Sequence, residues 1–450
     1  MKNMTDMIGY LTSSIGGKEF ESYLCKYQQL EPSKFAVIKV SGDCIENSLE
    51  EIIMSISVLQ YLKLCPIVLF GWGKPLNKKL KEEGIESKFI GGNRVTDFKT
   101  LGIITEVVSE LKGKIFSLSK EYGLNLADLT NEPIFAAKKS NDSLGYVGDV
   151  VGVNTELIKK ACESKAVPLL VPLGYDGNQI YNINADTATK ALVMALKPHK
   201  YISITNTGGV LDKDGKLIEK ISIIDDYQKL ADEGVVSGGM LKKLNEAKSL
   251  LEKLGNKNSV QIISPLLKDL WSELFSYKGS GTKIIYGYNT LTYDDGINGI
   301  DKDKLTQLIE SAFKGKKLIE SYFGAEPITH VVLEEDYDGA AIIEDHKGWA
   351  YMDKFAVNKN VEGNGLGSKI FLELLKLKNT GKFSKKSGLF WRCKVDNDKK
   401  EMYKKKIEEN SESGCYYSKP FIVFWIGGPK DELHDIIEYA LNKKETLVAK

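Results

Sequence analysis

The sequence predicts an α/β protein with a larger N-terminal domain built on a mostly parallel sheet and a smaller C-terminal domain of mixed strands and helices. From residue 35 onward, short apolar runs alternate with longer stretches in which apolar residues recur every three or four positions. Continuous apolar strands alternating with such helices are typical of a parallel sheet covered on both faces. With 450 residues, the chain exceeds what one hydrophobic core usually fills, so more than one domain is expected.

Four apolar runs are predicted to be central strands of the first domain, at residues 35–38, 67–70, 168–171 and 201–204. Between the first two runs, apolar residues from Ile45 to Leu62 lie at the spacing of one helix face. The alternation continues to about Thr282, and the turn-rich residues 293–299 separate it from a new apolar pattern. We therefore expect one domain at residues 1–283 and a second at residues 284–450.

The second domain is predicted to combine both element types in one short unit. An amphipathic stretch covers residues 305–313, and strand-like runs follow at 339–343, 349–357, 389–391 and 421–425. A helix lies between the second and third of these runs, with its apolar face formed by Ile370, Phe371, Leu374 and Leu375. This unit is too short to be a second copy of the first domain.

The composition excludes several classes of partner and site. Lys and Arg total 62 and Asp and Glu total 61, so no overall field attracts nucleic acid or an anionic membrane. The six cysteines include no Cys-x-x-Cys pair and there are only four histidines, so we expect reduced thiols and no metal site. No apolar run approaches the about 18 residues that a membrane span needs. No transit peptide is evident, and we expect the cytoplasm or the mitochondrial matrix.

A glycine-rich turn in the C-terminal domain follows the strand that ends with Phe355, Ala356 and Val357. The turn consists of Glu362, Gly363, Asn364, Gly365, Leu366 and Gly367. Because a helix begins at this turn, unpaired backbone N–H groups and the positive end of the helix dipole favour a pyrophosphate there. A flexible turn is the alternative, but the position between a strand and a helix favours an anion site.

These residues resemble the acetyl-CoA loop of the GNAT acetyltransferase superfamily, with Glu362 where that superfamily usually has Gln or Arg. The segments 353–355, 389–394 and 423–425 together resemble the acetyltransferase domain of N-acetylglutamate synthases. The family motif Phe-Trp-Arg-Ser-Arg corresponds here to residues 390–394, where Cys393 and Lys394 depart from it. Asn397 and Tyr403 follow at the family's spacing. The resemblance implies that acetyl-CoA is the co-substrate and L-glutamate the acceptor.

By this resemblance, Lys354, Arg392 and Lys394 hold the glutamate carboxylates, Asn397 orients the amino group and Tyr403 protonates the departing thiolate. The chemistry agrees, since a dicarboxylate in a partly desolvated pocket needs fixed cations and an arginine binds a carboxylate with two parallel hydrogen bonds. Lys394 lacks that two-pronged geometry. A solvent-exposed, purely structural role is the alternative for each of these basic residues.

The N-terminal domain resembles the amino-acid kinase fold of N-acetylglutamate kinase, a parallel-sheet sandwich, over roughly residues 20–283. The segments that carry the resemblance are 39–42, 70–77, 92–96, 182–186 and 238–243. With the C-terminal match, nearly the whole chain resembles the fused N-acetylglutamate synthase and kinase type. The kinase-like site residues implied are Lys39, Gly42, Gly71, Gly73, Arg94, Asn182, Asp186 and Lys243.

If that site is active, Lys39 and Lys243 neutralise the transferring phosphoryl group, Asp186 holds both lysines, and ATP with Mg²⁺ is required. Arg94 and Asn182 then hold acetylglutamate. The phosphate loops depart from the family at Ser41, at Phe70 and at Trp72, whose indole is expected to obstruct the phosphate unless the ring turns away. A domain without catalysis, acting as scaffold and regulator, is the alternative.

Regulation by L-arginine is a further implication of the resemblance. Arginine-sensitive relatives have an extra helix before the first strand, and residues 19–29 are predicted to form it. The arginine-site candidates are Glu273, Gly279 and Gly281. The resemblance also implies a homo-oligomer, a dimer or a tetramer.

The leading hypothesis is therefore an N-acetylglutamate synthase, which catalyses the first step of arginine biosynthesis. A bifunctional synthase and kinase, or a kinase with a silent acetyltransferase domain, is the first alternative. A non-catalytic arginine-sensing subunit is the second.

Overall fold

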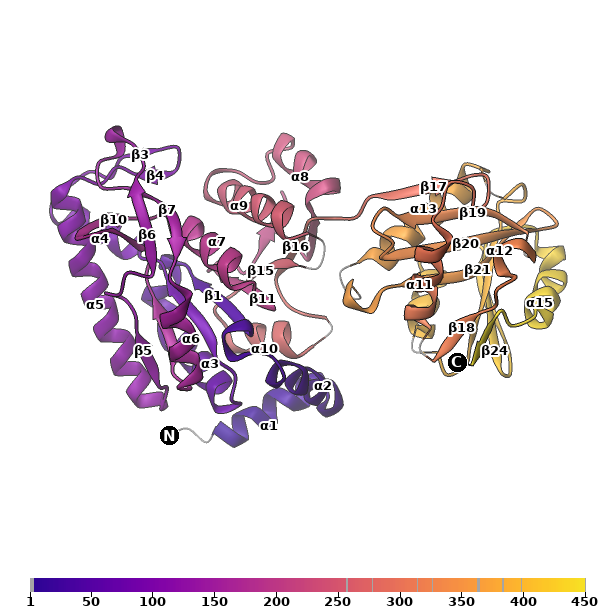
Figure 1. The fold of residues 1–450 in the computed structure, drawn as a ribbon, viewed down its shortest axis with the longest axis horizontal. Coiled ribbons are helices and arrows are strands. Elements are labelled where there is room, and N and C mark those ends of the chain that lie inside the picture. The colour runs from indigo at the N-terminus through magenta and orange to yellow at the C-terminus, as the bar shows by residue number, and fades with distance from the viewer. Residues whose placement is uncertain are drawn as a thin grey trace. The chain divides into compact units, whose positions relative to one another are not determined.

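The computed structural model describes residues 4–255, 258–276, 278–313, 315–325, 327–361, 365–382, 384–397 and 399–449. The chain forms two compact units, Met1–Tyr286 and Gly287–Lys450 (Figure 1). The boundary expected from the sequence lay between residues 283 and 284. The fold class is confirmed, because a mostly parallel sheet is followed by a smaller unit with a mixed sheet.

The N-terminal unit is built on an eight-stranded sheet with the order β14-β16-β15-β11-β1-β2-β8-β5. The four predicted central strands correspond to β1 (Ala36–Val40), β2 (Pro66–Phe70), β8 (Val167–Leu170) and β11 (Lys200–Ile204). The other members are β5 (Leu126–Asp128), β14 (Lys220–Ser222), β15 (Ser259–Ile263) and β16 (Thr282–Ile285). Every residue of β1 and β2 is buried, as expected for a strand covered on both faces. One pair, β15 with β16, is antiparallel, which the alternating pattern did not predict.

Helices connect and cover these strands. They are α3 (Ile45–Tyr61), α4 (Gly73–Glu82), α5 (Phe98–Tyr122), α6 (Thr155–Glu163), α7 (Ala185–Leu196), α8 (Ile223–Asp232), α9 (Gly238–Leu254) and α10 (Leu267–Phe275). Because β1 and β2 are parallel, the loops that follow them lie side by side at one edge of the sheet. These two loops enter α3, through the 3₁₀ turn η2 (Gly42–Cys44), and α4.

A smaller sheet and two hairpins complete the N-terminal unit. The sheet has the order β10-β9-β6-β7 and contains β6 (Phe135–Lys139), β7 (Gly148–Val153), β9 (Leu173–Asp176) and β10 (Gln179–Asn182). The hairpins pair β3 (Phe89–Ile90) with β4 (Asn93–Arg94) and β12 (Val210–Leu211) with β13 (Leu217–Ile218). Further 3₁₀ turns are η1 (Pro32–Lys34) and η3 (Asp142–Leu144).

Two helices precede the first strand, α1 (Met4–Ile15) and α2 (Gly17–Gln28). The sequence predicted only the second of them. Helix α2 packs on α10, where the Phe20 ring stacks on Trp271 at 5.2 Å and the Tyr27 hydroxyl donates to the Leu274 carbonyl at 2.5 Å. The N-terminal helices are therefore part of the core of this unit.

The C-terminal unit has a seven-stranded sheet with the order β17-β19-β20-β21-β22-β24-β23. Its strands are β17 (Thr290–Tyr293), β19 (Ile328–Glu334), β20 (Gly339–His346), β21 (Trp349–Val357), β22 (Leu389–Lys394), β23 (Ser413–Ser418) and β24 (Phe421–Ile426). All neighbours are antiparallel except β21 and β22. A separate pair joins β18 (Lys316–Leu318) to β25 (Leu447–Ala449).

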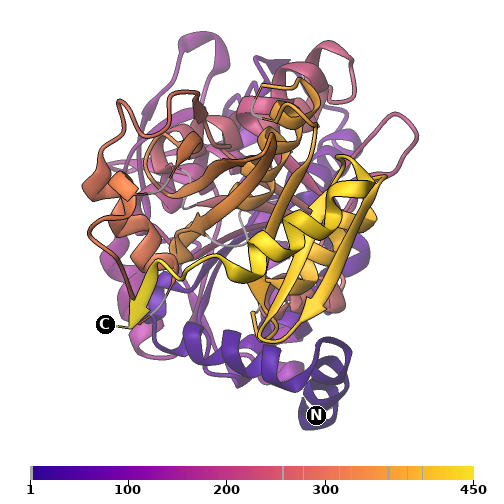
Figure 2. The ribbon, with the colours of Figure 1, turned by 90° about the vertical axis from the view of Figure 1, so that its right-hand side faces the viewer.

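Helices cover both faces of this sheet. They are α11 (Lys302–Ala312), α12 (Tyr322–Ala325), α13 (Leu366–Asn379), α14 (Lys400–Glu408) and α15 (Leu433–Asn442), with the 3₁₀ turns η4 (Lys359–Val361) and η5 (Lys430–Glu432). Tyr439 of α15 packs against Tyr351 of β21, whereas Phe371 of α13 packs against Phe355 of the same strand. Figure 2 shows α15 lying across the strands. Helices α13 and α15 thus cover opposite faces.

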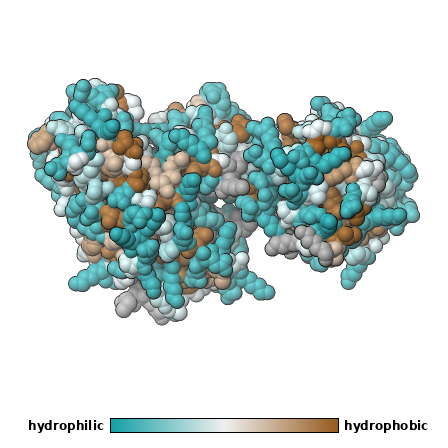
Figure 3. Space-filling view, viewed as in Figure 1, coloured by the Kyte–Doolittle hydropathy of each residue, from teal (hydrophilic) through white to brown (hydrophobic). Residues whose placement is uncertain are grey.

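No helix in the described part of the chain is long and apolar enough to cross a membrane. The face of the molecule in Figure 3 is mostly hydrophilic, and its hydrophobic residues form scattered patches.

Trp349, the first residue of β21, is fully buried in the core of the C-terminal unit. Its indole N–H donates to Glu432 at 2.7 Å, and its ring lies where a Cβ on Gly428 would come within 2.1 Å. Gly428 also has φ +83°, in the left-handed region. The ring therefore fits only because this residue is glycine.

We expect Gly428→Ala to destabilise the C-terminal unit, because the added methyl group overlaps the Trp349 ring in a well-packed core. Gly381→Ala is the matched control, since Gly381 has φ +68° but no atom within 4 Å of its Cβ position. Scanning calorimetry of the full chain should show Gly428→Ala less stable than the control by about 1–3 kcal/mol. Equal stability of the two variants would show that the indole moves aside.

Candidate functional site

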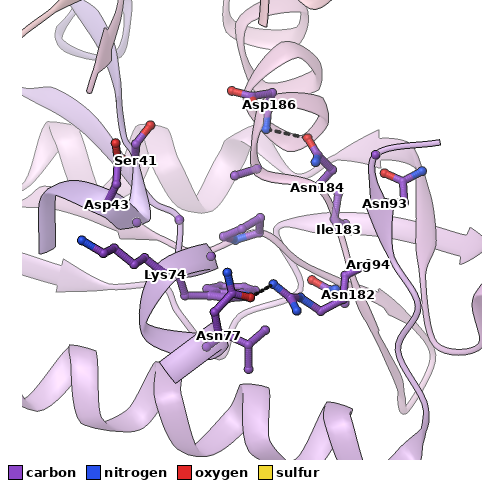
Figure 4. Close-up of a pocket in the computed structure, with 18 of the residues that line it drawn as sticks. Ser41, Asp43, Lys74, Asn77, Asn93, Arg94, Asn182, Ile183, Asn184 and Asp186 are labelled. Atoms are coloured by element: carbon purple, nitrogen blue, oxygen red, sulfur yellow. Dashed lines mark hydrogen bonds between the residues drawn. The ribbon is translucent and has the colours of Figure 1, made fainter. Parts of the chain in front are cut away.

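One cavity in the N-terminal unit gathers all eight residues that the sequence assigned to the kinase-like site. Its volume is about 420 Å³, and its lining includes Lys39, Gly42, Gly71, Gly73, Arg94, Asn182, Asp186 and Lys243. Lys39 comes from β1, the glycines from the loops after β1 and β2, and Asp186 from the first turn of α7. Figure 4 shows Asp186 and Asn184 on one side of the pocket and Arg94 with Asn77 on the other.

A buried charge cluster forms the first side. The Lys39 ammonium lies 2.9 Å from the Asp186 carboxylate and 3.0 Å from the Ser41 hydroxyl, and Lys243 lies 3.7 Å from the same carboxylate. Asn184 caps α7 by accepting the backbone N–H of Asp186 at 3.0 Å, which fixes the start of that helix. Asn184 lies within the segment 182–186, but its capping role was not assigned from the sequence.

The two lysines differ in how firmly they hold their protons. Burial alone would lower the pKa of Lys39, but the Asp186 carboxylate outweighs it and raises that pKa. Burial and the nearby Lys39 charge lower the pKa of Lys243 to about 8. Burial opposes ionisation of Asp186, yet the two lysines lower its pKa to about 2. At neutral pH the cluster thus carries two cations and one anion.

The second side of the cavity presents neutral hydrogen-bonding groups around one guanidinium. Arg94 donates to Asn77 at 2.5 Å and to Ser87, and it lies 4.6 Å over the Phe89 ring. The Asn182 amide donates to the Thr96 hydroxyl at 3.0 Å. Asn77 ends the segment 70–77 that carried the resemblance, although its contact with Arg94 was not predicted.

The phosphate loops approach each other so closely that glycine is required. A Cβ on Gly42 would lie 2.6 Å from the backbone nitrogen of Gly73. Trp72, between these loops, is only 5% exposed, and its side chain belongs to the cluster with Leu76, Ile104 and Val108. The ring thus packs into the core, as the alternative in the sequence analysis allowed, and Trp72 also forms part of the cavity lining.

In the C-terminal unit, β21 and β22 pair only at Ala350 with Leu389 and at Tyr351 with Phe390. Both strands continue well beyond these pairs, to Val357 and Lys394, so they separate from each other along most of their length. Strand β21 also contains a bulge at Asp353. Met352 and Lys354 pair with the adjacent β20 residues Ile343 and Ile342, so Asp353 is an extra residue without a partner of its own in this ladder.

The predicted cations lie on the α15 face of this sheet. Lys354 is buried and lies 2.5 Å from Asp353, 2.7 Å from the Thr446 hydroxyl and 4.9 Å from the centre of the Tyr322 ring. The Asp353 carboxylate also accepts from the Tyr322 hydroxyl at 2.7 Å. The bulge places Asp353 where it holds the Lys354 ammonium, a partner that the sequence did not predict.

Arg392 and Lys394 already have partners within the chain. The Arg392 guanidinium donates to the carbonyls of Ala440 at 2.6 Å, Leu441 at 3.3 Å and Lys443 at 2.7 Å. It therefore caps the C-terminal end of α15, where carbonyls lack helical partners. Lys394 lies 3.3 Å from Glu445. The sequence missed both arrangements because nothing in it located the chain after α15.

Tyr403 lies on the opposite face, where its ring packs against Phe355, Trp391 and Phe424. Burial, with a smaller contribution from Cys393, raises the pKa of Tyr403 above its ordinary value, so the phenol is protonated at neutral pH. Asn397 accepts the backbone N–H of Lys399 at 2.7 Å in the turn before α14. The side-chain carbonyl of Asn397 is therefore engaged in a hydrogen bond that shapes this turn.

The predicted acetyl-CoA loop is described in part. Glu362, Gly363 and Asn364 lie outside the described residues. Gly365 precedes α13 with φ +90°, and a Cβ on Gly367 would lie 3.6 Å from the side chains of Phe355 and Val357. The start of α13 thus lies directly against the last residues of β21, which include Ala356.

Two of the three arginine-site candidates, Glu273 and Gly279, lie against each other. Glu273 is buried on α10 and pairs with Lys200 at 2.8 Å, and it accepts the Ser280 N–H at 3.4 Å. A Cβ on Gly279 would lie 2.8 Å from the Glu273 carboxylate. One on Gly281 would lie 2.0 Å from the Ile262 carbonyl, so close packing by itself requires glycine there.

Among the described residues, no group of three or more His, Cys, Asp or Glu side chains is placed to hold a metal ion.

Comparison with known proteins identifies the family. Residues 34–264 match the amino acid kinase family, and residues 290–446 match the N-acetyltransferase domain of N-acetylglutamate synthase. The acetylglutamate kinase of Xanthomonas campestris pv. campestris is 33% identical over 441 residues, covering 96% of this chain and 99% of that one. The chain belongs to the amino acid kinase family. It is of the fused type, in which an N-acetylglutamate synthase acetyltransferase domain follows the kinase domain.

Solved structures of the fused type have the same fold. The N-acetylglutamate synthase of Neisseria gonorrhoeae complexed with coenzyme A and N-acetylglutamate has a TM-score of 0.64 at 17% identity, covering 92% of this chain and 98% of that one. Its complex with coenzyme A and L-arginine has a TM-score of 0.58 at 16% identity, with the same coverage.

If the cavity binds a nucleotide, the pKa of Lys243 predicts how the affinity depends on pH. Lys243 is charged below about pH 8 and loses its charge above it, so binding of an anionic phosphate weakens as pH rises through that value. Above its pKa, the charged fraction of Lys243 falls by about ten-fold for each pH unit. We therefore expect the Kd of a non-hydrolysable ATP analogue to rise by up to about ten-fold between pH 7.5 and 9.

Isothermal titration at constant ionic strength measures this change. Lys243→Met should bind the analogue weakly with a flat pH profile, and Lys253→Met, on the exposed side of α9, should keep the wild-type profile. A flat profile in the wild-type protein would contradict the prediction.

Proposed function

We propose that the C-terminal unit transfers the acetyl group of acetyl-CoA to the amino group of L-glutamate, the first step of arginine biosynthesis. The observation that carries the proposal is the separation of β21 from β22, with cations on one face and the Tyr403 phenol on the other. A thioester lying in that opening would have the acceptor's carboxylates on the α15 side and a proton donor on the α13 side.

Each residue then has a chemical task. The backbone at Gly365 and the start of α13 holds the pyrophosphate of acetyl-CoA, since unpaired N–H groups and the helix dipole favour it. Lys354 and Lys394 attract the glutamate carboxylates, and the neutral amine attacks the thioester carbonyl. The carbon–sulfur bond breaks, the thiolate takes the Tyr403 proton, and the proton lost by the attacking nitrogen restores the phenol through solvent. Arg392 acts on this site by holding the end of α15.

A second activity is favoured by the N-terminal cavity. We propose that it transfers a phosphoryl group from ATP to N-acetylglutamate, so that the fused chain is bifunctional. Two observations support this: the Trp72 ring packs with core side chains of α4 and α5, and Lys39, Asp186 and Lys243 form a cluster whose two cations would stabilise a phosphate. Mg²⁺ would arrive with the nucleotide, and Arg94 with Asn182 would hold the acceptor across the cavity.

We further propose L-arginine as an effector that binds beside α2. The Neisseria gonorrhoeae enzyme was solved with L-arginine, and Glu273 here offers a buried carboxylate, the group that binds a guanidinium with two parallel hydrogen bonds. Since Lys200 already pairs with Glu273, an incoming arginine would share that carboxylate with an internal cation. Affinity in the micromolar to millimolar range is therefore expected.

A pair of assays on one preparation tests both activities. We expect the protein to consume acetyl-CoA when given L-glutamate and to consume ATP when given N-acetylglutamate. Absence of the first activity would reject the acetyltransferase proposal, and absence of the second would reject the kinase proposal. Absence of both with arginine binding intact would favour a non-catalytic arginine-sensing subunit.

Tyr403→Phe is expected to lower kcat of acetyl transfer by about 10²–10⁴-fold, the usual contribution of a positioned proton donor, with little change in glutamate binding. The phenol ring is buried among aromatic side chains, so the substitution preserves the packing. Steady-state kinetics with glutamate titration separates the two parameters. An unchanged kcat would remove Tyr403 from the reaction.

Glu273→Gln is expected to abolish arginine binding, because it removes the carboxylate that a guanidinium needs. Glu252→Gln, an exposed change on α9, is the charge-matched control. Titration calorimetry with L-arginine up to millimolar concentration measures the difference. Lack of binding to the wild-type protein, or equal binding to both variants, would contradict the arginine proposal.

A further inference from the structure

The segment after α15 contacts every cation that the sequence assigned to glutamate. We call residues 443–446 the C-terminal strap. The Lys354 ammonium lies 2.7 Å from the Thr446 hydroxyl, Arg392 donates to the Lys443 carbonyl at 2.7 Å, and Lys394 lies 3.3 Å from the Glu445 carboxylate. Three basic residues from two strands thus meet one short piece of chain.

The strap is fixed at both ends. Upstream, the Lys443 ammonium lies 2.5 Å from the buried Glu344 carboxylate of β20. Downstream, β25 pairs with β18 in an antiparallel register from Leu318 with Leu447 to Lys316 with Ala449. The position of the strap beside Lys354 and Lys394 is therefore built into the fold of the C-terminal unit.

Glu445 is the acidic member of the strap. Its carboxylate lies between two ammonium groups, 3.3 Å from Lys394 and 3.5 Å from Lys316. Its side chain is 48% exposed, so an incoming anion can reach the same cations. The hydrogen bond from Lys394 holds the pKa of Glu445 below its ordinary value, so the carboxylate is ionised at neutral pH.

The charges around the strap are mainly positive. Lys354, Arg392 and Lys394 contact it from the two strands, and Lys316 lies beside Glu445. The strap itself adds Lys443, which is paired with Glu344, and Lys444. The carboxylates of Asp353 and Glu445 offset part of this charge, and the remaining excess of cations favours an acceptor that carries carboxylates.

We propose that Glu445 sets the affinity of the acceptor site for its substrate, because its carboxylate competes with that of the substrate for Lys394. The proposal rests on the acetyl transfer to glutamate proposed above. Glu445 sets how strongly a second carboxylate is attracted, and it weakens the binding of glutamate while leaving the reacting atoms untouched. Its effect is transmitted through Lys394.

A double-mutant cycle tests this coupling. In Glu445→Gln, KM for L-glutamate should fall about three-fold with kcat unchanged, a modest effect because the pair is half exposed. Lys394→Met should raise KM. In the double variant, Glu445→Gln should have no further effect, since the cation through which it acts is gone. Glu438→Gln, an exposed change on α15, is the charge-matched control and should have the wild-type KM.

The outcomes separate this inference from the proposed function. If the wild-type protein consumes acetyl-CoA with glutamate but Glu445→Gln leaves KM unchanged or raises it, the role of Glu445 is rejected. Independent effects of the two substitutions, or a fall in KM also seen with Glu438→Gln, would reject it equally. If the wild-type protein has no acetyl transfer to glutamate, the proposed function fails and the inference fails with it.

Discussion

The pairing of four buried or partly buried ammonium groups with internal carboxylates is the constraint on which the candidate sites depend. Lys39 is held by Asp186, Lys200 by Glu273, Lys354 by Asp353 and Lys443 by Glu344. An isolated charge in these positions would be strongly disfavoured, because burial removes its hydration. The pairs keep each cation charged and fix its position before any ligand arrives.

This constraint also decides which cations are available to a ligand. Lys39 and Lys354 are nearly fully buried and tightly paired, so they act as fixed parts of their sites. Lys243 and Lys394 are more exposed and lie farther from their carboxylates, at 3.7 Å and 3.3 Å. These loosely held cations are the ones that an incoming phosphate or carboxylate is able to take over. Both units thus combine a fixed ammonium group with a second, exchangeable one.

The sequence predicted the parts of this protein that depend on local pattern. The four apolar runs became β1, β2, β8 and β11, and the loops after β1 and β2 meet because parallel strands present their ends at one edge. The eight kinase-like residues, which line one cavity, came instead from the resemblance to N-acetylglutamate kinase. The place of the glycine turn before α13 was also predictable, since strand, turn and helix are consecutive in the chain.

Features that depend on contacts between distant residues were not predictable. The direction of the Trp72 ring is set by α5, and the partners of Arg392 are set by the end of α15. For Trp72 and Arg392 the residue was noted, but its neighbours come from a segment whose position no local pattern gives. Helix α1 is a different case, because its apolar residues recur at the spacing of one helix face and pack on the core, so a local pattern was overlooked: Met4, Met7, Ile8, Leu11 and Ile15.

The extra residue in β21 has a consequence for how this strand tolerates change. With Asp353 inserted, Tyr351 and Lys354 both face α15, while Phe355 and Val357 face α13. Deleting a single residue between Trp349 and Asp353 would invert every later side chain, exchanging the ammonium group with the aromatic ring. The opening between the strands is cationic on one face and aromatic on the other. This arrangement depends on the number of residues in β21 as well as on their chemistry.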